Sequence, residues 1–331
     1  MGDVLLKYAT AQPLCVLHND NTDTYIFFAD GITSPEFVVN RKGIKDVISG
    51  GGNTFFKSAD NYTIKVNKAG TNCLIKFNLT NGKHLQILTI TKEQAMDSWK
   101  IKLQGKEYLI ISLDDLIVLN DSIRLQTMRS STFEWSVFPS IFFIKSNQHE
   151  LLKPLKDGLF SHYTIKLPEI KYNFLWKEDS VLAGKLTLAV PRKNKGADSS
   201  NFSLPLYNTT LQAVPGARYY VVEGLPDLES SKNVSNAFIK IDYVGDTQAA
   251  YLNGNLIADD FYKGEPMIIA VKPFAKEMSG NKITLLVTPQ SSDRKIFFEE
   301  KVKPLQRNPT GVRQVEIITQ YQVFLTAEKN Q

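Results

Sequence analysis

An acidic and aromatic segment of the chain has the residue types that recognise sugars. A sugar is held when an aromatic side chain stacks on the apolar face of its ring and carboxylates or amides accept its hydroxyl protons. The segment predicts carbohydrate contacts through five side chains: Tyr251, Asp259, Asp260, Phe261 and Tyr262. Packing in the core is the alternative for the aromatic pair. Phe261 and Tyr262 are consecutive, so on a strand only one of them faces the core.

Three pairs of adjacent carboxylates invite a comparison with glycoside hydrolysis: Asp114-Asp115, Asp259-Asp260 and Glu299-Glu300. That reaction needs two carboxyl groups facing each other across the bond, about 5–5.5 Å apart for retention and about 6.5–9.5 Å apart for inversion. Adjacent residues on a strand point to opposite faces, so no pair can act as a unit. We expect these pairs in turns and at strand ends. No catalytic residue is identified, and whether the chain is an enzyme stays open.

Other catalytic and ligand-binding motifs are missing from the sequence. There is no G-x-S-x-G elbow of a serine hydrolase. The four histidines lack the H-x-H or H-E-x-x-H spacing of a metal site: His18, His84, His149 and His162. The glycine-rich stretch 49–53 lacks the Lys-Ser/Thr that completes a phosphate-binding loop. We therefore predict neither a metal nor a cofactor.

Composition and charge narrow the classes of partner. The 331 residues carry a formal charge of only +5, so no nucleic-acid partner is expected. A short basic cluster at 192–195 is interpreted as a solvated loop rather than an anion or nucleic-acid contact. Hydrophobic residues make up 43%, enough for a core, yet no apolar run approaches the roughly 18 residues of a membrane span.

The cysteines and the N-terminus say little about the compartment. Cys15 and Cys73 are the only cysteines, so a disulfide framework is excluded. We expect two buried thiols, with a single bridge as the alternative. The first residues lack the basic and apolar regions of a secretory signal. Because strand-like sequence follows Met1 and Gly2 almost at once, we interpret the chain as part of a longer protein.

Alternation of apolar and polar residues with a period of two dominates the sequence and indicates antiparallel strands. Asn81-Gly82 and Asn253-Gly254 each lie between two such runs, and both are predicted as two-residue hairpin turns. Near the end, a final strand is predicted with one side directed at a core. That side carries Val315, Ile317, Thr319, Tyr321, Val323 and Leu325.

Helix signals are few. A capping-box pattern at Thr91 to Gln94 predicts a short helix through Trp99, and 276–278 predict one more turn. No strands alternate with helices of ten to fifteen residues, so a parallel α/β sheet or a (β/α)₈ barrel is not expected. The fold class is therefore all-β, with antiparallel β-sandwich domains.

Two domains are expected from the length and from a polar interruption between Ser146 and Asp157. They would comprise residues 1–150 and 151–331. A polar, irregular stretch at about 191–217 is predicted to be a long loop between strands of the second domain.

Several segments resemble the multidomain β-galactosidases of glycoside hydrolase family 35. In the first half, residues 6–15, 24–29 and 35–37 resemble the part that follows the catalytic barrel in that family, and 90–99 resemble a short helix of the same middle domain. In the second half, residues 239–246, 250–254, 256–262 and 264–266 resemble the C-terminal jelly-roll module, which is akin to galactose-binding domains.

The chain also departs from the family. It has no counterpart of the barrel that carries the two catalytic glutamates, so no catalytic residue is carried over. After Pro266 the family leads us to expect a tryptophan, whereas this chain has Met267. The missing ring removes a stacking platform and weakens the case for sugar binding by this module.

The resemblance implies an accessory, non-catalytic region of a β-galactosidase-like glycoside hydrolase. Its implied partners are a catalytic barrel of the same protein, docked through exposed apolar surface, and a β-galactoside-type glycan. A stand-alone carbohydrate-binding or surface scaffolding protein is the alternative, and a hydrolase with an unrecognised site between its sandwiches is a further one. The family context favours a periplasmic, cell-surface or extracellular location.

Overall fold

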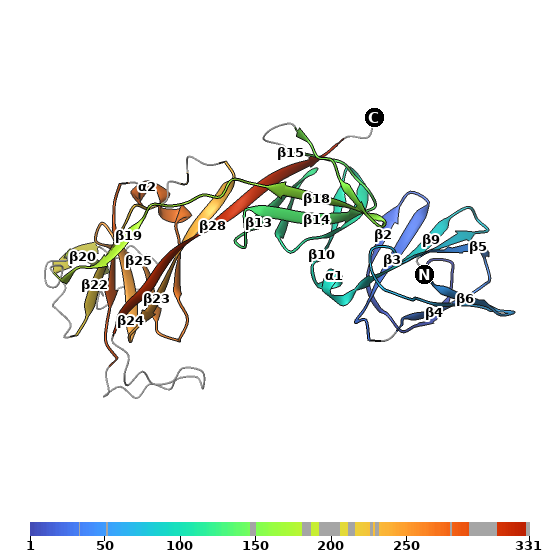
Figure 1. The fold of residues 1–331 in the computed structure, drawn as a ribbon, viewed down its shortest axis with the longest axis horizontal. Helices are drawn as coiled ribbons and strands as arrows, with labels where there is room; N and C mark the ends of the chain where they lie inside the picture. The colour runs from blue at the N-terminus through green and yellow to red at the C-terminus, as the bar shows by residue number, and fades with distance from the viewer. Residues whose placement is uncertain are drawn as a thin grey trace, which may run out of the picture. The chain divides into compact units, whose positions relative to one another are not determined.

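In a computed structural model, the described part of the chain is nearly all strand (Figure 1). It describes residues 1–32, 34–50, 52–145, 150–180, 187–191, 206–210, 216–225, 228, 232–278, 280–290 and 310–328. The predicted all-β class is confirmed. Two compact units are present: Met1–Leu167 with Gln322–Gln331, and Pro168–Tyr321. The division falls inside the long final strand β28 (Gly311–Ala327).

The first unit begins with two packed sheets. One contains, in order, β1 (Leu6–Ala9), β4 (Glu36–Asn40), β7 (Asn61–Lys65) and β6 (Thr54–Lys57). The other contains β2 (Gln12–Asn19), β3 (Thr22–Ala29), β9 (His84–Thr91), β8 (Leu74–Leu79) and β5 (Ile44–Ser49). Alternating apolar residues of both sheets, such as Phe37 and Phe77, form one buried cluster. The β3 and β9 strands pair in parallel, the exception among antiparallel neighbours of these two sheets.

A second pair of sheets completes this unit. One contains β10 (Ser98–Leu103), β11 (Lys106–Ile111), β14 (Thr132–Phe138), β18 (Phe160–Lys166) and β17 (Leu155–Asp157). The other contains β12 (Asp115–Leu119), β13 (Ser122–Thr127), the end of β28, β15 (Phe143–Lys145) and β16 (Glu150–Leu151). Aromatic side chains fill the core between them, with Trp135 stacked on Tyr163 and Phe143 at the edge of both rings.

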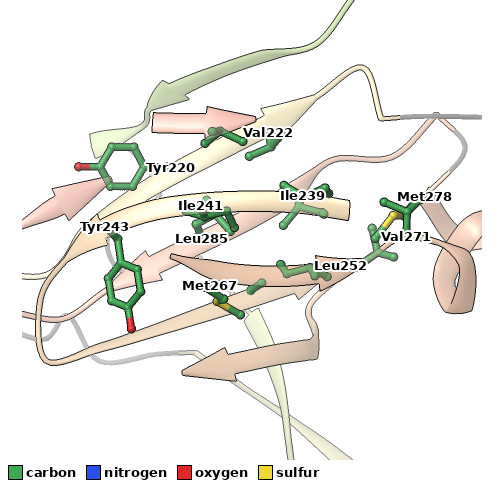
Figure 2. Close-up of a cluster of buried hydrophobic side chains, with 14 of the residues drawn as sticks. Tyr220, Val222, Ile239, Ile241, Tyr243, Leu252, Met267, Val271, Met278 and Leu285 are labelled. Carbon is green, nitrogen blue, oxygen red and sulfur yellow. The ribbon is translucent and has the colours of Figure 1, made fainter. Parts of the chain in front are cut away.

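The second unit is a sandwich of one large and one small layer. The large sheet contains β19 (Leu175–Glu178), β22 (Arg218–Glu223), β27 (Ile283–Val287), β24 (Thr247–Leu252), β25 (Asn255–Phe261), β20 (Thr187–Pro191) and β21 (Leu206–Thr210). The small layer is formed by β26 (Met267–Ala270), β23 (Val234–Val244) and the start of β28. Side chains from both layers make the buried cluster drawn in Figure 2.

Both predicted hairpins form, but their turns differ. Asn253 and Gly254 have φ of 51° and 80° and join a directly paired β24 and β25, so this is the predicted two-residue turn. In the β8–β9 hairpin only Gly82 has positive φ. There the Leu79 amide donates to the Lys83 carbonyl oxygen at 2.9 Å, which encloses three residues. The predicted two-residue turn is wrong at this place, because a type I turn followed by a left-handed glycine closes the same strands.

Gly254→Val is expected to destabilise the second unit by about 1–2 kcal/mol, because a side chain with a branched Cβ is strained at positive φ. The free energy of unfolding from urea denaturation, followed by circular dichroism, measures the effect. Asn255→Val is the matched control on the adjacent strand position. An unchanged midpoint for Gly254→Val would show that the turn does not hold this conformation.

The last strand matches its prediction in outline. Val315, Tyr321, Val323 and Leu325 are buried, while Ile317 and Thr319 are half-buried. The strand pairs with β23 along residues of the second unit and with β15 along residues of the first.

In the part of the chain that the structure describes, two short α-helices and the 3₁₀ turn η2 (Lys272–Phe274) accompany the sheets. The capping box is present: the Gln94 amide donates to Thr91 Oγ1 at 3.2 Å, and the Thr91 amide donates to Gln94 Oε1 at 3.0 Å. The helix α1 (Lys92–Met96) ends earlier than predicted, because Trp99 already belongs to β10. The second predicted turn is α2 (Ala275–Met278), preceded by η2.

Two further expectations need correction or completion. The stretch predicted as one loop from 191 to 217 begins at the last residue of β20 and contains the strand β21, which pairs with β20. Residues 192–205, with the basic cluster, and 211–215 lie outside the described part. Cys73 is buried as expected, but Cys15 is only half-buried, and both thiols are free. Burial raises the pKa of both thiols.

Candidate functional site

The five residues predicted to contact carbohydrate lie on β24, on β25 and just after it. In this antiparallel pair Gln248 lies opposite Asp260, and Ala249 lies opposite Asp259. The register shifts between Ala250 and Tyr251, where a bulge inserts one residue into β25. Because side chains alternate along a strand, this register decides which of the five share a face.

Tyr251, Asp259 and Phe261 belong to the outer face of the large sheet, away from the core cluster. Phe261 is 73% exposed, and Asp259 is exposed too. In the register of the pair, Asp259 lies opposite Ala249, two residues from Tyr251. Burial, followed by the charges of Asp259 and of Tyr219, raises the pKa of Tyr251. An exposed ring, a carboxylate and a phenol on one surface are able to stack on a sugar and accept its hydroxyl protons.

Asp260 and Tyr262 point the other way, toward the interior of the sandwich. The Tyr262 ring packs edge-on against Tyr243, with centroids 5.4 Å apart, and its amide donates to the Asp246 carbonyl oxygen at 2.9 Å. Asp260 accepts a long hydrogen bond of 3.4 Å from the Tyr243 hydroxyl and lies 4.0 Å from the Lys263 ammonium. The sequence predicted that only one of the two consecutive aromatic residues faces the core, and the structure assigns that role to Tyr262.

Met267 is also directed inward. It is 4% exposed and lies among the core side chains of Figure 2, opposite Ile241 on β23. The expectation that an aromatic ring at this position would be a stacking platform is therefore wrong for this fold. A side chain at this position fills the core, so methionine here removes no ligand surface.

The adjacent carboxylates are separated as the strand geometry requires. Asp114 is 4% exposed and paired with Arg129 at 2.7 Å, whereas Asp115 is exposed. Asp259 and Asp260 project to opposite faces of β25, as the previous contacts show. The third pair, Glu299-Glu300, lies outside the described residues.

Among the described residues, no three His, Cys, Asp or Glu side chains are grouped so as to hold a metal ion. His18 pairs with Asp23 at 2.8 Å on the surface, and His162 contacts Ser136 at 3.1 Å. His84 bonds to Asn78 at 2.7 Å, and His149 lies outside the described part. No helix of the described part has the length and apolarity needed to cross a membrane.

A depression of about 260 Å³ in the first unit lies at the ends of β3 and β9. Its wall includes the carboxylates Asp30 and Glu93, the Lys68 ammonium and the exposed Ile32. Segments 24–29, 35–37 and 90–99 all contribute residues to this wall, so they meet in space although they are far apart in the sequence.

Sequence reasoning missed Gln248, Tyr243, Asp246 and Tyr219. Gln248 is fully buried and neither atom of its amide group has a hydrogen-bond partner, and the buried Tyr219 hydroxyl lacks one as well. The signal for Gln248 was present in the alternation of β24, where a glutamine occupies the inward series that continues with Ala250 and Leu252.

Comparison with known proteins gives little. No family model matches the chain, and no curated protein matches it either.

Two solved structures that resemble the chain weakly are glycoside hydrolases. A rhamnosidase from Novosphingobium sp. PP1Y has a TM-score of 0.19 and 10% identity, over 71% of this chain and 26% of its own. A GH31 alpha-xylosidase from Xanthomonas citri has a TM-score of 0.16 and 10% identity, over 98% of this chain and 38% of its own. The chain thus spans well under half the length of either enzyme, and scores of this size support no argument about shared fold or activity.

Proposed function

We propose that this chain is the accessory, non-catalytic β-sandwich region of a β-galactosidase-like glycoside hydrolase. One observation carries the proposal. The four family-like segments between residues 239 and 266 form consecutive parts of one sandwich, namely β23, β24 with its two-residue turn, β25 and the entry to β26. Segments that resemble a single module thus fold as a single module. Residues 1–150 and 151–331 are proposed as the middle and galactose-binding-like domains.

The geometry of the acidic residues supports a role without chemistry. Among the described residues, neither adjacent pair offers two carboxyl groups facing one another, which both mechanisms of glycoside hydrolysis need. The proposed partner is a catalytic barrel of the same protein. Exposed apolar side chains of the first unit, including Ile32 and Met96, supply surface of the kind that docking of another domain covers.

The proposed carbohydrate contact is the outer face of β24 and β25. Tyr251, Asp259 and Phe261 lie there, and a β-galactoside-type glycan is the proposed ligand. The same face supports the alternative of a stand-alone carbohydrate-binding or scaffolding protein, because it needs no barrel to bind a glycan. Asp260 and Tyr262 face the interior of the sandwich, so in this proposal they support the outer face and do not contact the glycan.

Phe261→Ala is expected to weaken binding of a β-galactoside oligosaccharide about tenfold, the effect of losing one aromatic anchor. Isothermal titration calorimetry of the whole chain measures it. Leu256→Ala is the matched control, because Leu256 is also exposed on β25 but carries no ring. Equal affinities of the parent chain and both variants would remove Phe261 from the site.

Two experiments separate the accessory role from its competitors. The chain is expected not to release the aryl group from an aryl β-galactoside. Release that a single Asp or Glu replacement abolishes would overturn the non-catalytic assignment. The coding sequence upstream of Met1 is expected to encode a barrel in the same frame; an in-frame stop codon there would favour the stand-alone alternative.

A further inference from the structure

A buried polar cluster occupies one end of the interior of the second unit. Gln248 lies at its centre, with 0% exposure and no partner for either its amide oxygen or its amide nitrogen. A buried amide that has lost water without gaining a partner costs about 1–3 kcal/mol, so native proteins rarely retain one. Because no side chain or backbone group of the described residues forms a hydrogen bond with the Gln248 side-chain amide, a group from outside the chain is its natural partner.

Gln248 faces a weakly satisfied carboxylate. Asp260 is directly opposite on β25, and side chains at such a position share a face with Cβ atoms about 4.5–5.5 Å apart. The two contacts of Asp260 are long: 3.4 Å from the Tyr243 hydroxyl and 4.0 Å from Lys263. Both lie beyond the usual range of strong charge-assisted bonds, which is about 2.7–2.9 Å. The carboxylate therefore keeps acceptor capacity beside the unpaired amide.

A second acidic residue is tied to the same elements through its backbone. Asp246 is 8% exposed in the connection between β23 and β24, and its backbone oxygen accepts the Tyr262 amide. Burial and then the charge of Asp260, with smaller contributions from Tyr262 and Asp246, raise the pKa of the Tyr243 hydroxyl. The Tyr243 hydroxyl lies 3.4 Å from Asp260, and its ring packs against Tyr262; Figure 2 shows this side chain at the end of the aliphatic cluster.

We propose that this cluster, formed by Tyr243, Asp246, Gln248, Asp260 and Tyr262, binds a calcium ion. Every polar side-chain atom of the cluster except the Gln248 nitrogen is an oxygen. Calcium takes six to eight oxygen ligands, from carboxylates, amide and backbone carbonyls and water, in flexible geometry. Two carboxylates balance the charge of the ion, and Gln248 Oε1 is the third protein ligand. With nitrogen and sulfur ligands lacking in this cluster, zinc and copper are disfavoured.

The geometry also explains why the sequence did not reveal the site. Only two of its members are acidic, so the cluster lacks the grouping of three acidic, histidine or cysteine side chains that marks most metal sites. The third ligand is an amide on an inward strand position, and the three positions meet through the register of β24 with β25. The Lys263 side chain, 61% exposed, is free to leave Asp260 when a cation arrives.

Terbium luminescence tests the proposal on the whole chain, because Tb³⁺ replaces calcium and is excited by energy transfer from nearby tyrosine rings. The parent chain is expected to give saturable emission that calcium displaces, and calcium is expected to raise the melting temperature, since a ligand specific to the folded state stabilises it. Asp260→Asn and Gln248→Met should each lower the affinity for calcium at least tenfold. Asp259→Asn is the matched control: the same charge is lost one residue away on the opposite face, and affinity should stay within twofold.

A variant that is expected to bind calcium more tightly distinguishes loss of the site from misfolding. Gln248→Glu adds an anionic oxygen, so it should lower the melting temperature without calcium and bind calcium more tightly than the parent chain. Circular dichroism confirms that each variant is folded. The competing hypothesis is that water, and not calcium, occupies the cluster. In that case Gln248→Met is at least as stable as the parent, calcium shifts neither melting temperature, and Tb³⁺ emission is absent or equal in all variants. That result overturns the proposal.

Discussion

Trp135→Ala is expected to lower the free energy of unfolding by about 3–5 kcal/mol, the range for truncating a buried large aromatic side chain. Trp135 is 1% exposed and stacks on Tyr163 with centroids 5.2 Å apart and planes at 10°. Phe143, from the facing sheet, meets both rings edge-on. Truncation leaves a cavity that the rigid sheets on either side cannot close. Urea denaturation followed by circular dichroism measures the loss.

Trp135→Phe is the matched control, because it keeps a ring in the core and removes the indole nitrogen. That nitrogen is buried and has no hydrogen-bond partner. Removing an unpaired buried donor costs nothing and offsets part of the lost packing. The phenylalanine variant should therefore lose less than half as much stability as the alanine variant. Equal losses would contradict the unpaired state of the indole nitrogen and would mean that packing is not the dominant contribution.

The sequence predicted strands and hairpins well because the signals for them are local. Alternation is visible in any window of a few residues, and Asn-Gly pairs mark the points where the chain reverses. The exact turn was predicted for Asn253-Gly254 but not for Asn81-Gly82. Both connections place a glycine at positive φ. What differs is which residues of the flanking strands pair first, and that depends on the packing of whole sheets.

Long-range pairing lay beyond local signals. The parallel pairing of β3 with β9 brings Thr22 beside His84, across more than sixty residues of chain. Likewise β23 pairs with the start of β28. The alternation within a strand does not predict which other strand pairs with it, because any sheet of matching shape can cover its apolar face equally well.

The candidate site was predicted as a set of residue types, and the structure divided it. Period-two alternation implies that Phe261 and Tyr262 take opposite faces, but only the register with β24 shows which one turns inward. Gln248 is the instructive omission. Its inward position followed from the alternation, yet its lack of a partner depends on every side chain around it. Met267 shows the reverse error, since a position read as ligand surface belongs to the core.

Gly245→Ala is expected to destabilise the second unit by about 3 kcal/mol, the upper part of the range for overpacking. A Cβ at this position would lie 2.6 Å from the Thr288 carbonyl oxygen and 2.7 Å from Val287 Cγ1. The oxygen cannot retreat, because it accepts the Asp246 amide at 2.8 Å. Either that hydrogen bond or the pairing of β24 with β27 has to yield. Thermal unfolding followed by circular dichroism measures the effect.

Gly50→Ala is the control for the general effect of replacing glycine in this chain. A Cβ at Gly50 meets only the Leu74 carbonyl oxygen, at an ordinary 3.7 Å. Its φ, like that of Gly245, lies outside the left-handed region, so alanine should be neutral or should stabilise by about 0.4–1 kcal/mol through the unfolded state. If both variants melt alike, the backbone near Thr288 is more open than the structure shows. A loss confined to Gly245→Ala ties the stability of this sandwich to one close approach beside Asp246.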